Sequence, residues 1–259
     1  MNLDIEGHRI LVCGASSGFG RAIAETLLKE GAYCIVTARR QELLEEIYSD
    51  YPLDQVTTVP MDLTEPDAVD RLVKYTDEAL LHGVVLNAGG PPTGTPLKTT
   101  MSQWDEAYQL VMRWKIELAT RLAPVLAEHN YGRMLFIESQ SVKQPLPSLV
   151  LSNAFRAGVT SFAKSLALEV ADRGVTINVI APGSHNTPAI ERVIKNRSES
   201  EQISMEEARE RMEASIPVGR MGEAEELASL AAWLMSPLSG FVTGQTISHD
   251  GGTISGIFG

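Results

Sequence analysis

Three glycines lie close together near the start of the chain, between an apolar run and an amphipathic stretch. The segment Gly14-Ala15-Ser16-Ser17-Gly18-Phe19-Gly20 follows the apolar run that ends at Cys13. One glycine allows a tight turn, a second lets the backbone approach a pyrophosphate, and a third lets a helix pack on a strand. The helix N-terminus then offers free N–H groups to an anion. Such a run also occurs in plain loops, but its place between strand and helix patterns favours a dinucleotide site.

Two arginines, Arg39 and Arg40, stand at the end of the second predicted strand. An NAD site places an acid there to accept from the ribose 2'-hydroxyl, whereas a guanidinium suits a 2'-phosphate. A charge-assisted hydrogen bond contributes about 1.5–3 kcal/mol, which corresponds to a roughly ten- to hundredfold preference. The sequence therefore predicts NADP(H) as the cofactor, ahead of NAD(H). The alternative is that both arginines are solvated residues at a helix start.

Short β-rich runs alternate with longer amphipathic stretches along the whole chain. Several of the runs are continuously apolar, which is typical of parallel strands covered on both faces. The predicted strands are 9–13, 32–38, 56–60, 83–87, 133–137, 175–180 and 243–248. This alternation predicts an α/β fold with a doubly wound, seven-stranded parallel sheet of the Rossmann type and right-handed crossovers. Because no linker or repeat divides residues 1–259, we expect a single domain.

One segment, 188–215, interrupts the alternation and is crowded with charged residues. Charge of this kind is typical of a solvated helix pair. The other interpretation is a mobile lid, because a long insertion after a strand's carboxyl end lies where ligands bind. The expected pocket walls are this segment together with 90–97 and 144–151.

Composition narrows the class of protein further. The chain has 259 residues and a formal net charge of -11, which argues against nucleic acid and anionic membrane surfaces as partners. No apolar run approaches the ~20 residues of a membrane span, and the acidic first residues do not resemble a signal peptide. Cys13 and Cys34 lie in apolar runs, which predicts buried, reduced thiols. We therefore expect a cytoplasmic protein.

Other chemistries lack their residue patterns. The five histidines form no ligand pair at helical or finger spacing, and two isolated cysteines make no zinc site, so no metal is predicted. The G-K-[ST] ending of a nucleoside triphosphate loop is missing.

Nearly end to end, the chain resembles the short-chain dehydrogenase/reductase family. The motifs that carry the resemblance are Gly14, Gly18 and Gly20; Asp62-Leu63; Asn87-Ala88-Gly89; Asn178 and Pro182-Gly183 with Thr187 following; and the tail motifs 216–220, 243–244 and 250–252. The tail is similar to that of reductases that act on 3-oxoacyl groups. The resemblance implies that Asp62-Leu63 contacts adenine and that Asn87-Ala88-Gly89 runs beside the adenine ribose. It also implies that the stretch from Pro182 to Thr187 holds the nicotinamide carboxamide.

The catalytic positions depart from this family. The resemblance places Ser152 where the family has its proton-donating Tyr, and Arg156 where it has Lys. It keeps Ser139 as the family's Ser and puts Val111 in place of the Asn. A serine hydroxyl is too weak an acid for direct proton transfer, and an arginine stays charged and cannot shuttle protons. The usual mechanism is therefore excluded, whereas hydride transfer is not.

Other groups near the expected nicotinamide site are candidate proton donors. Lys143 follows Ser139 by four residues, and His185 titrates in a useful range. Each also has a structural interpretation, Lys143 as an exposed loop charge and His185 as a backbone contact. Glu138 adjoins Ser139 and is expected to face away, because adjacent strand residues point to opposite faces.

Two functions follow. The first is an NADP(H)-dependent oxidoreductase that acts on a small-molecule carbonyl/alcohol pair through Ser139, Ser152, Arg156 and Lys143. The alternative is an inactive nucleotide-binding protein that serves as a sensor or partner subunit. The resemblance implies a homotetramer. The apolar ending at 254–258 suits burial against a neighbour or against its own subunit.

Overall fold

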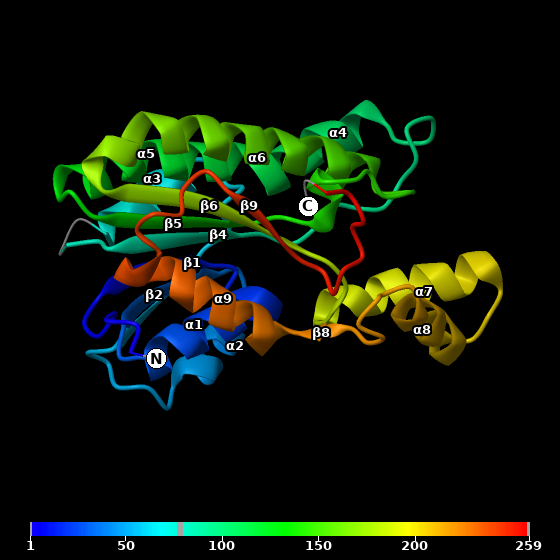
Figure 1. Cartoon of the computed structure of the whole chain (residues 1–259), viewed down its shortest axis with the longest axis horizontal. Helices are drawn as coiled ribbons and strands as arrows, with labels where there is room; N and C mark the ends of the chain where they lie inside the picture. Colours follow the sequence, from blue (N-terminus) through cyan, green and yellow to red (C-terminus); the bar gives the residue numbers. More distant parts are fainter. Residues whose placement is uncertain (1, 77–79, 258–259) are drawn as a thin grey trace.

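Seven parallel strands form the central sheet of the computed structural model, which describes residues 2–76 and 80–257 (Figure 1). The strands follow the order β3-β2-β1-β4-β5-β6-β9. Their bounds are β1 Arg9–Cys13, β2 Tyr33–Ala38, β3 Val56–Pro60, β4 Gly83–Asn87, β5 Gly132–Ile137, β6 Val175–Pro182 and β9 Thr246–His249. The predicted single-domain Rossmann-type sheet is confirmed. Because the order reverses between β1 and β4, a crevice forms at the carboxyl ends of these two strands.

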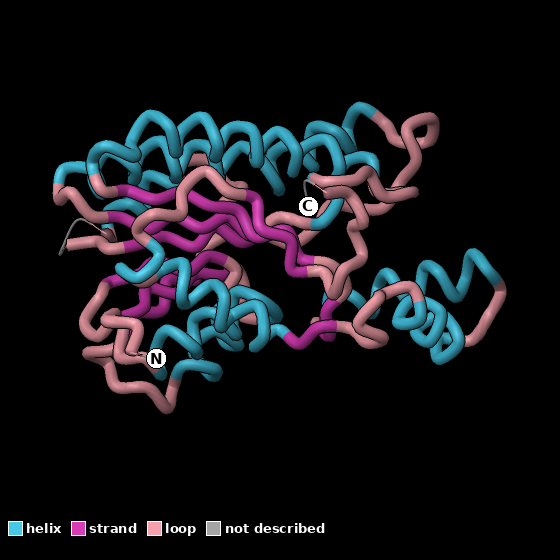
Figure 2. Tube along the Cα trace, in the orientation of Figure 1, coloured by secondary structure: helices cyan, strands magenta, loops and turns pink. Residues whose placement is uncertain are grey.

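Helices cover both faces of the sheet (Figures 1 and 2). One layer holds α1 Gly18–Lys29, α2 Gln41–Tyr48 and α9 Ala224–Met235; the other holds α3 Ala68–Lys74, α4 Met101–Tyr108, α5 Trp114–Glu128 and α6 Val150–Val170. A π-helical turn, Gln109–Arg113, joins α4 to α5, and short 3₁₀ turns lie at η2 Gln140–Val142, η3 Ala171–Arg173 and η4 Pro237–Ser239.

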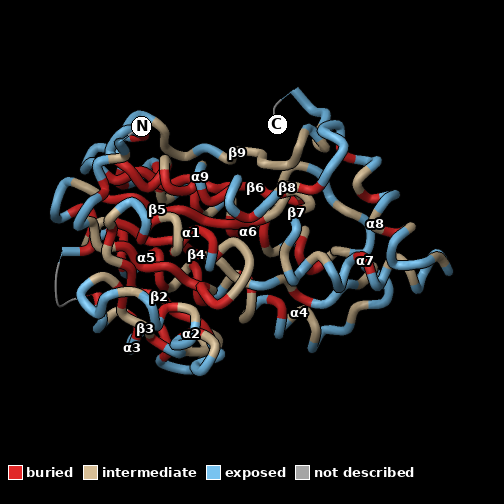
Figure 3. Tube along the Cα trace, turned by 90° about the horizontal axis from the view of Figure 1, so that it is seen from below, coloured by how far each residue is buried: buried red, intermediate tan, exposed pale blue. Residues whose placement is uncertain are grey.

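The continuous apolar runs serve two cores at once. In β5, Leu135 and Ile137 pack towards the α1/α9 layer, whereas Met134 and Phe136 pack towards α5 and α6. All four side chains are buried, and Figure 3 shows the strands as the buried centre of the molecule. A strand with apolar side chains on both faces gains burial on both, which explains why the sequence does not alternate.

Two strand ends differ from the predicted bounds by two residues or more, and the others agree to within one residue. The last strand begins at Thr246 and not at Thr243, because Gly244 has a φ of +65° and turns the chain. The Asn178 side chain supports that turn, donating to the Val242 carbonyl and accepting from the Gln245 N–H. The sixth strand continues to Pro182, since its pairing with β9 extends that far.

The charged segment 188–215 forms two helices, α7 Pro188–Glu201 and α8 Met205–Ala214 (Figure 1). They enclose a small apolar core of their own, made of Ile194, Ala208, Met212, Ile216 and Met221. Arg209 and Arg211 form ion pairs with Glu191 and Glu201 across the two helices. A short two-stranded sheet, β7 His185–Asn186 with β8 Gly222–Glu223, joins the pair to the body. The pair is thus charged and helical, and its movement as a lid stays a prediction.

Within 2–76 and 80–257, no helix has the length and apolar character needed to cross a bilayer. Cys13 and Cys34 are buried free thiols, as predicted. In the described part of the chain, no cluster of three or more His, Cys, Asp or Glu side chains is arranged to hold a metal ion.

Candidate functional site

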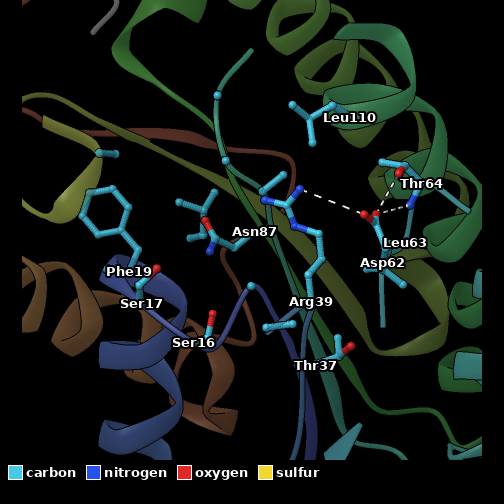
Figure 4. Close-up of a pocket in the computed structure, with 18 of the residues that line it drawn as sticks. Ser16, Ser17, Phe19, Thr37, Arg39, Asp62, Leu63, Thr64, Asn87 and Leu110 are labelled. Atoms are coloured by element: carbon cyan, nitrogen blue, oxygen red, sulfur yellow. Dashed lines mark hydrogen bonds and ion pairs between the residues drawn. The ribbon is translucent and has the colours of Figure 1, made fainter. Parts of the chain in front are cut away.

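A cavity of about 550 Å³ lies at the carboxyl edge of the sheet (Figure 4). Its walls come from the ends of β1, β2, β3, β4 and β5, the first turn of α1, the π-helical turn and the start of α5, one residue of α6 and the start of α7. The sequence-predicted cofactor residues that line it are Gly14, Ser16, Ser17, Gly18, Phe19, Arg39, Arg40, Asp62, Leu63, Asn87, Ala88, Gly89, Arg156 and Thr187. The fold therefore brings most of the separate motifs to one cavity.

The three glycines of the first loop have different structural requirements. A Cβ at Gly14, whose φ is +68°, would lie 2.7 Å from the side-chain nitrogen of Asn87, and one at Gly20 would overlap the Gly14 carbonyl. A Cβ at Gly18 would find only Thr187, at 3.6 Å. Open space therefore remains before the first turn of α1, where Ser17 makes no side-chain cap. The free N–H groups of that turn fit a pyrophosphate.

Two cations flank the end of the cavity where the sequence predicts the adenine of a cofactor. Arg40 donates to the hydroxyl oxygens of Ser16 at 3.2 Å and Ser17 at 3.4 Å. Arg39 is more exposed and lies 4.0 Å from a carboxylate oxygen of Asp62, as Figure 4 shows. With Ala38 at the position where an NAD site has its acid, this end of the cavity suits a phosphate.

At the other end of the cavity, Arg156 is held in place by a network of acceptors. Its Nε donates to the Ser152 hydroxyl oxygen at 3.0 Å, one turn earlier in α6. Its Nη1 donates to the carboxylate and to the backbone carbonyl of Glu138, each at 3.0 Å. Its Nη2 has a longer contact, 3.5 Å, with the Gly89 carbonyl. Arg156 itself lines the cavity, whereas Ser152 reaches it through Arg156.

Glu138 lines the same cavity, contrary to the expectation that it faces away. The expectation was wrong because the site lies on the same face of the sheet as the Glu138 side chain. Glu138 continues the alternation of Met134 and Phe136, and thus points to the face that α5 and α6 cover. Since α6 carries Arg156, this is the face on which the polar residues meet.

Lys115 is a site residue that the sequence reasoning missed. It is fully buried on α5, and its Nζ donates to the Glu138 carboxylate at 2.5 Å and to the Ile137 carbonyl at 3.4 Å. Burial lowers the pKa of Lys115 to about 8, with Arg156 adding to this effect and Glu138 opposing it. A signal was present, because Lys115 stands among the apolar positions Trp114, Leu118 and Leu122 of one helix.

Two other predicted catalytic residues lie outside the lining of the cavity. The Ser139 hydroxyl accepts the N–H of Ser141 at 3.1 Å and caps the turn η2. Lys143 ends that same turn. Neither borders the cavity that holds Arg156, and Val111 is a buried apolar residue of the π-helical turn.

Only part of the stretch from Pro182 to Thr187 lies at the cavity. Thr187 lines the cavity, but Pro182, Gly183 and His185 do not. The His185 ring packs edge-on against Phe19 with centroids 5.0 Å apart, and its Nε2 lies 2.9 Å from Nδ1 of His249. Burial lowers the pKa of His185. His185 thus supports the Phe19 side of the cavity and borders a second cavity of about 350 Å³.

Sequence comparison places this arrangement among known proteins. Residues 14–253 match the family described as Enoyl-(Acyl carrier protein) reductase. The chain is 30% identical over 250 residues to the 3-oxoacyl-acyl-carrier-protein reductase FabG of Haemophilus influenzae, covering 96% of this chain and 98% of the relative. It is 33% identical over 252 residues to nodulation protein G of a Rhizobium species, with the same shares covered.

Solved structures have the same fold. L-sorbose reductase from Gluconobacter frateurii, complexed with NADPH and L-sorbose, matches with a TM-score of 0.91 at 26% identity, over 99% of this chain and 100% of that one. Actinorhodin polyketide ketoreductase with NADPH matches with a TM-score of 0.90 at 28% identity, over 95% of this chain and 97% of that one. From the match over 14–253 and the near full-length relatives, we conclude that the chain belongs to the short-chain dehydrogenase/reductase family of oxidoreductases.

Proposed function

We propose that this protein is an NADP(H)-dependent oxidoreductase that acts on a carbonyl/alcohol pair without the Tyr and Lys usual in its family. One observation carries the proposal: a single cavity has the glycine loop and Arg39 at one end and the buried Arg156 at the other. The first end suits a phosphorylated adenine nucleotide and the second suits a developing negative charge.

The cofactor assignment rests on charge at the adenine end. Arg39 and Arg40 supply two guanidinium groups there, and Ser16 and Ser17 supply hydroxyl groups. Guanidinium binds phosphate by charge-assisted hydrogen bonds of about 1.5–3 kcal/mol each. Two solved relatives that contain NADPH, L-sorbose reductase and actinorhodin ketoreductase, support NADP(H) as the cofactor.

The chemistry assigned to the other end is stabilisation of an oxyanion. Bound NADPH supplies a hydride that forms the new C–H bond at the carbonyl carbon, while the C=O π electrons move to oxygen. Arg156 stabilises that oxygen, with Ser152 and Glu138 holding its guanidinium in place. Since arginine does not release a proton at working pH, the alkoxide takes its proton from water.

The partners proposed for this chain are three further copies of itself, in the homotetramer that the family implies. In the single chain Ile257 is 92% exposed, so it is not tucked onto its own subunit. Phe258, the other large residue of the ending, lies outside the described residues. Sedimentation analysis of the purified chain tests this: a tetramer is expected, and a monomer contradicts it.

The second candidate is a nucleotide-binding protein without turnover. The observation that favours it is the engagement of Arg156, whose Nε and Nη1 are already bonded to Ser152 and Glu138. A guanidinium used in this way can be a structural support. Under this alternative, NADPH binds but no carbonyl compound is reduced.

Turnover separates the two candidates. NADPH is mixed with the pure protein and a panel of ketones, aldehydes and 3-oxoacyl thioesters, and its oxidation is followed. We expect turnover of at least one substrate, a ~10²–10³-fold lower kcat in Arg156→Ala, and no change in Ser165→Ala, which removes an exposed hydroxyl from the same helix. Binding of NADPH without turnover on any member of the panel favours the second candidate.

A further inference from the structure

Three charged side chains are buried together behind the reacting end of the cavity. The side chains of Lys115 and Glu138 are 0% exposed, and that of Arg156 is 7% exposed. They come from α5, the end of β5 and α6, so three different elements place them in contact. Removing charged groups from water is costly unless each is paired, and the way these three pair is informative.

The Glu138 carboxylate bridges the two cations. One of its oxygens accepts from the Lys115 ammonium and the other accepts from Nη1 of Arg156 at 3.0 Å. The backbone contributes as well, because both cations also donate to the Ile137 carbonyl, each at 3.4 Å. Glu138, bonded to Nη1, and Ser152, bonded to Nε, therefore hold the guanidinium in one position.

The charges within this cluster do not cancel. The charged or titratable groups that face Lys115 are Glu138, Arg156 and, from β1, Cys13. Burial raises the pKa of Cys13 to about 12, so it remains a neutral thiol. Two cations thus share one anion while Lys115 is protonated. The surplus positive charge faces the cavity through Nη2 of Arg156, whose one hydrogen bond within residues 2–76 and 80–257 is the 3.5 Å approach to the Gly89 carbonyl.

We propose that Lys115 and Glu138 are positioning residues for the reaction. Glu138 holds the Arg156 guanidinium against the cavity. The Lys115 ammonium offsets the negative charge of Glu138, so that the positive charge of Arg156 acts on the substrate oxygen that becomes anionic. This rests on the proposed function, since it concerns the same oxygen. It adds two residues, neither of which touches the substrate oxygen, and a charge state on which the reaction depends.

The cluster gives the reaction a pH dependence of known sign. Below its pKa of about 8, Lys115 is charged and the cluster carries a net charge of +1. Above that pH Lys115 loses its proton, the Glu138 carboxylate offsets Arg156, and the net charge falls to zero. Stabilisation of an oxyanion therefore weakens as the pH rises through about 8.

The first test measures the cluster without turnover. The full-length protein is labelled with ¹⁵N-lysine, and the side-chain resonances are followed by NMR as the pH is raised. We expect one lysine, missing from the Lys115→Met spectrum, to titrate near pH 8, and to titrate lower in Glu138→Gln because the anion that raises its pKa is gone. Titration of Lys115 near the ordinary lysine value, or an unchanged value in Glu138→Gln, overturns the proposal.

The second test uses kcat. In the wild-type protein kcat is expected to fall as the pH rises through about 8. In Lys115→Met, kcat is expected to be ~10–100-fold lower, which is the loss seen for residues that orient a functional side chain without contacting the ligand. In this variant kcat is also expected to stay constant as the pH rises through about 8. The KM for NADPH is expected to stay the same, and Lys29→Met, at an exposed position of α1, to behave as wild type.

The outcomes distinguish this proposal from the proposed function. If substrates turn over but kcat is flat from neutral pH to well above 8 and Lys115→Met matches Lys29→Met, the positioning roles are wrong and the proposed function stands. If no substrate turns over, the proposed function fails. The NMR titration then still tests whether Lys115 titrates near pH 8 and whether its pKa depends on Glu138. The wild-type titration does not depend on any variant folding.

Discussion

Arginine and lysine differ at position 156 in the number and geometry of their donors. The guanidinium reaches Ser152, Glu138 and the cavity at the same time, using three different nitrogens. A lysine ammonium is a single point with three hydrogens, and cannot span acceptors that lie this far apart. The contacts with Ser152 and Glu138 thus favour arginine over lysine at this position.

Arg156→Lys is accordingly expected to be a damaging substitution. We expect kcat to fall by ~10²-fold, near the lower end of the loss for an oxyanion donor, with little change in the KM for NADPH. Steady-state kinetics on the substrate identified from the panel measures both. The matched control is Arg173→Lys, in the exposed turn after α6. A lysine variant as fast as wild type contradicts the role given to the guanidinium.

The residues after β2 are expected to set the cofactor preference. Combining Ala38→Asp with Arg39→Ser replaces a phosphate-binding cation by an acceptor for a ribose hydroxyl. The affinity ratio of NADPH to NADH should change in favour of NADH by about ten- to a hundredfold per charge-assisted hydrogen bond removed. Fluorescence titration with both nucleotides measures it, with Arg71→Ala on α3 as control. A ratio equal to that of wild type rules out this assignment.

The packing of α1 on the glycine loop sets the shape of the phosphate site. A Cβ at Gly20 would overlap the carbonyl oxygen of Gly14, so Gly20→Ala must displace the start of the helix. Overpacking of this kind costs about 1–3 kcal/mol. We expect a lower melting temperature and at least tenfold weaker NADPH binding, measured by calorimetry. Gly256→Ala, where a Cβ meets nothing within 4 Å, serves as control; equal behaviour of the two variants contradicts this view of the loop.

The α7–α8 pair is the element expected to respond to cofactor. Pro188 and Ala189, in the first turn of α7, line the cavity, while the rest of the pair packs on a small separate core. Elements with few buried apolar contacts open most readily. NADPH is therefore expected to slow amide hydrogen exchange in residues 188–201, with no change in the well-packed α9. Exchange in α7 that is the same with and without NADPH refutes the lid.

Across the whole molecule, the sequence predicts the sheet better than the reacting centre. The strands were accessible because each parallel strand carries its apolar pattern locally. The glycine loop was accessible because its three glycines lie between a strand pattern and a helix pattern, and the structure places close backbone contacts at two of them, Gly14 and Gly20. The bonding of Lys115 to Glu138 was not, since it joins residues 23 positions apart on a helix and a strand end. The direction of the Glu138 side chain becomes clear only when the fold shows which face of the sheet α5 and α6 cover.

The same reason explains the residues placed elsewhere. Ser139 and Lys143 were chosen by position along the chain, but η2 turns the Ser139 hydroxyl onto a backbone N–H. His185 was placed near the nicotinamide end by its neighbours in sequence, whereas its ring lies edge-on to Phe19 and stacks on His249. In both cases a local hydrogen bond or ring contact determines the direction of the side chain, and neither is visible in a sequence pattern.

Calorimetric titration of the purified wild-type chain with NADPH and, separately, with NADH tests the central claim most directly. The arrangement of Arg39, Arg40 and the glycine loop predicts saturable uptake of NADPH, with a dissociation constant about ten- to a hundredfold lower than that for NADH. Absence of binding by both nucleotides, or tighter binding of NADH, would contradict it.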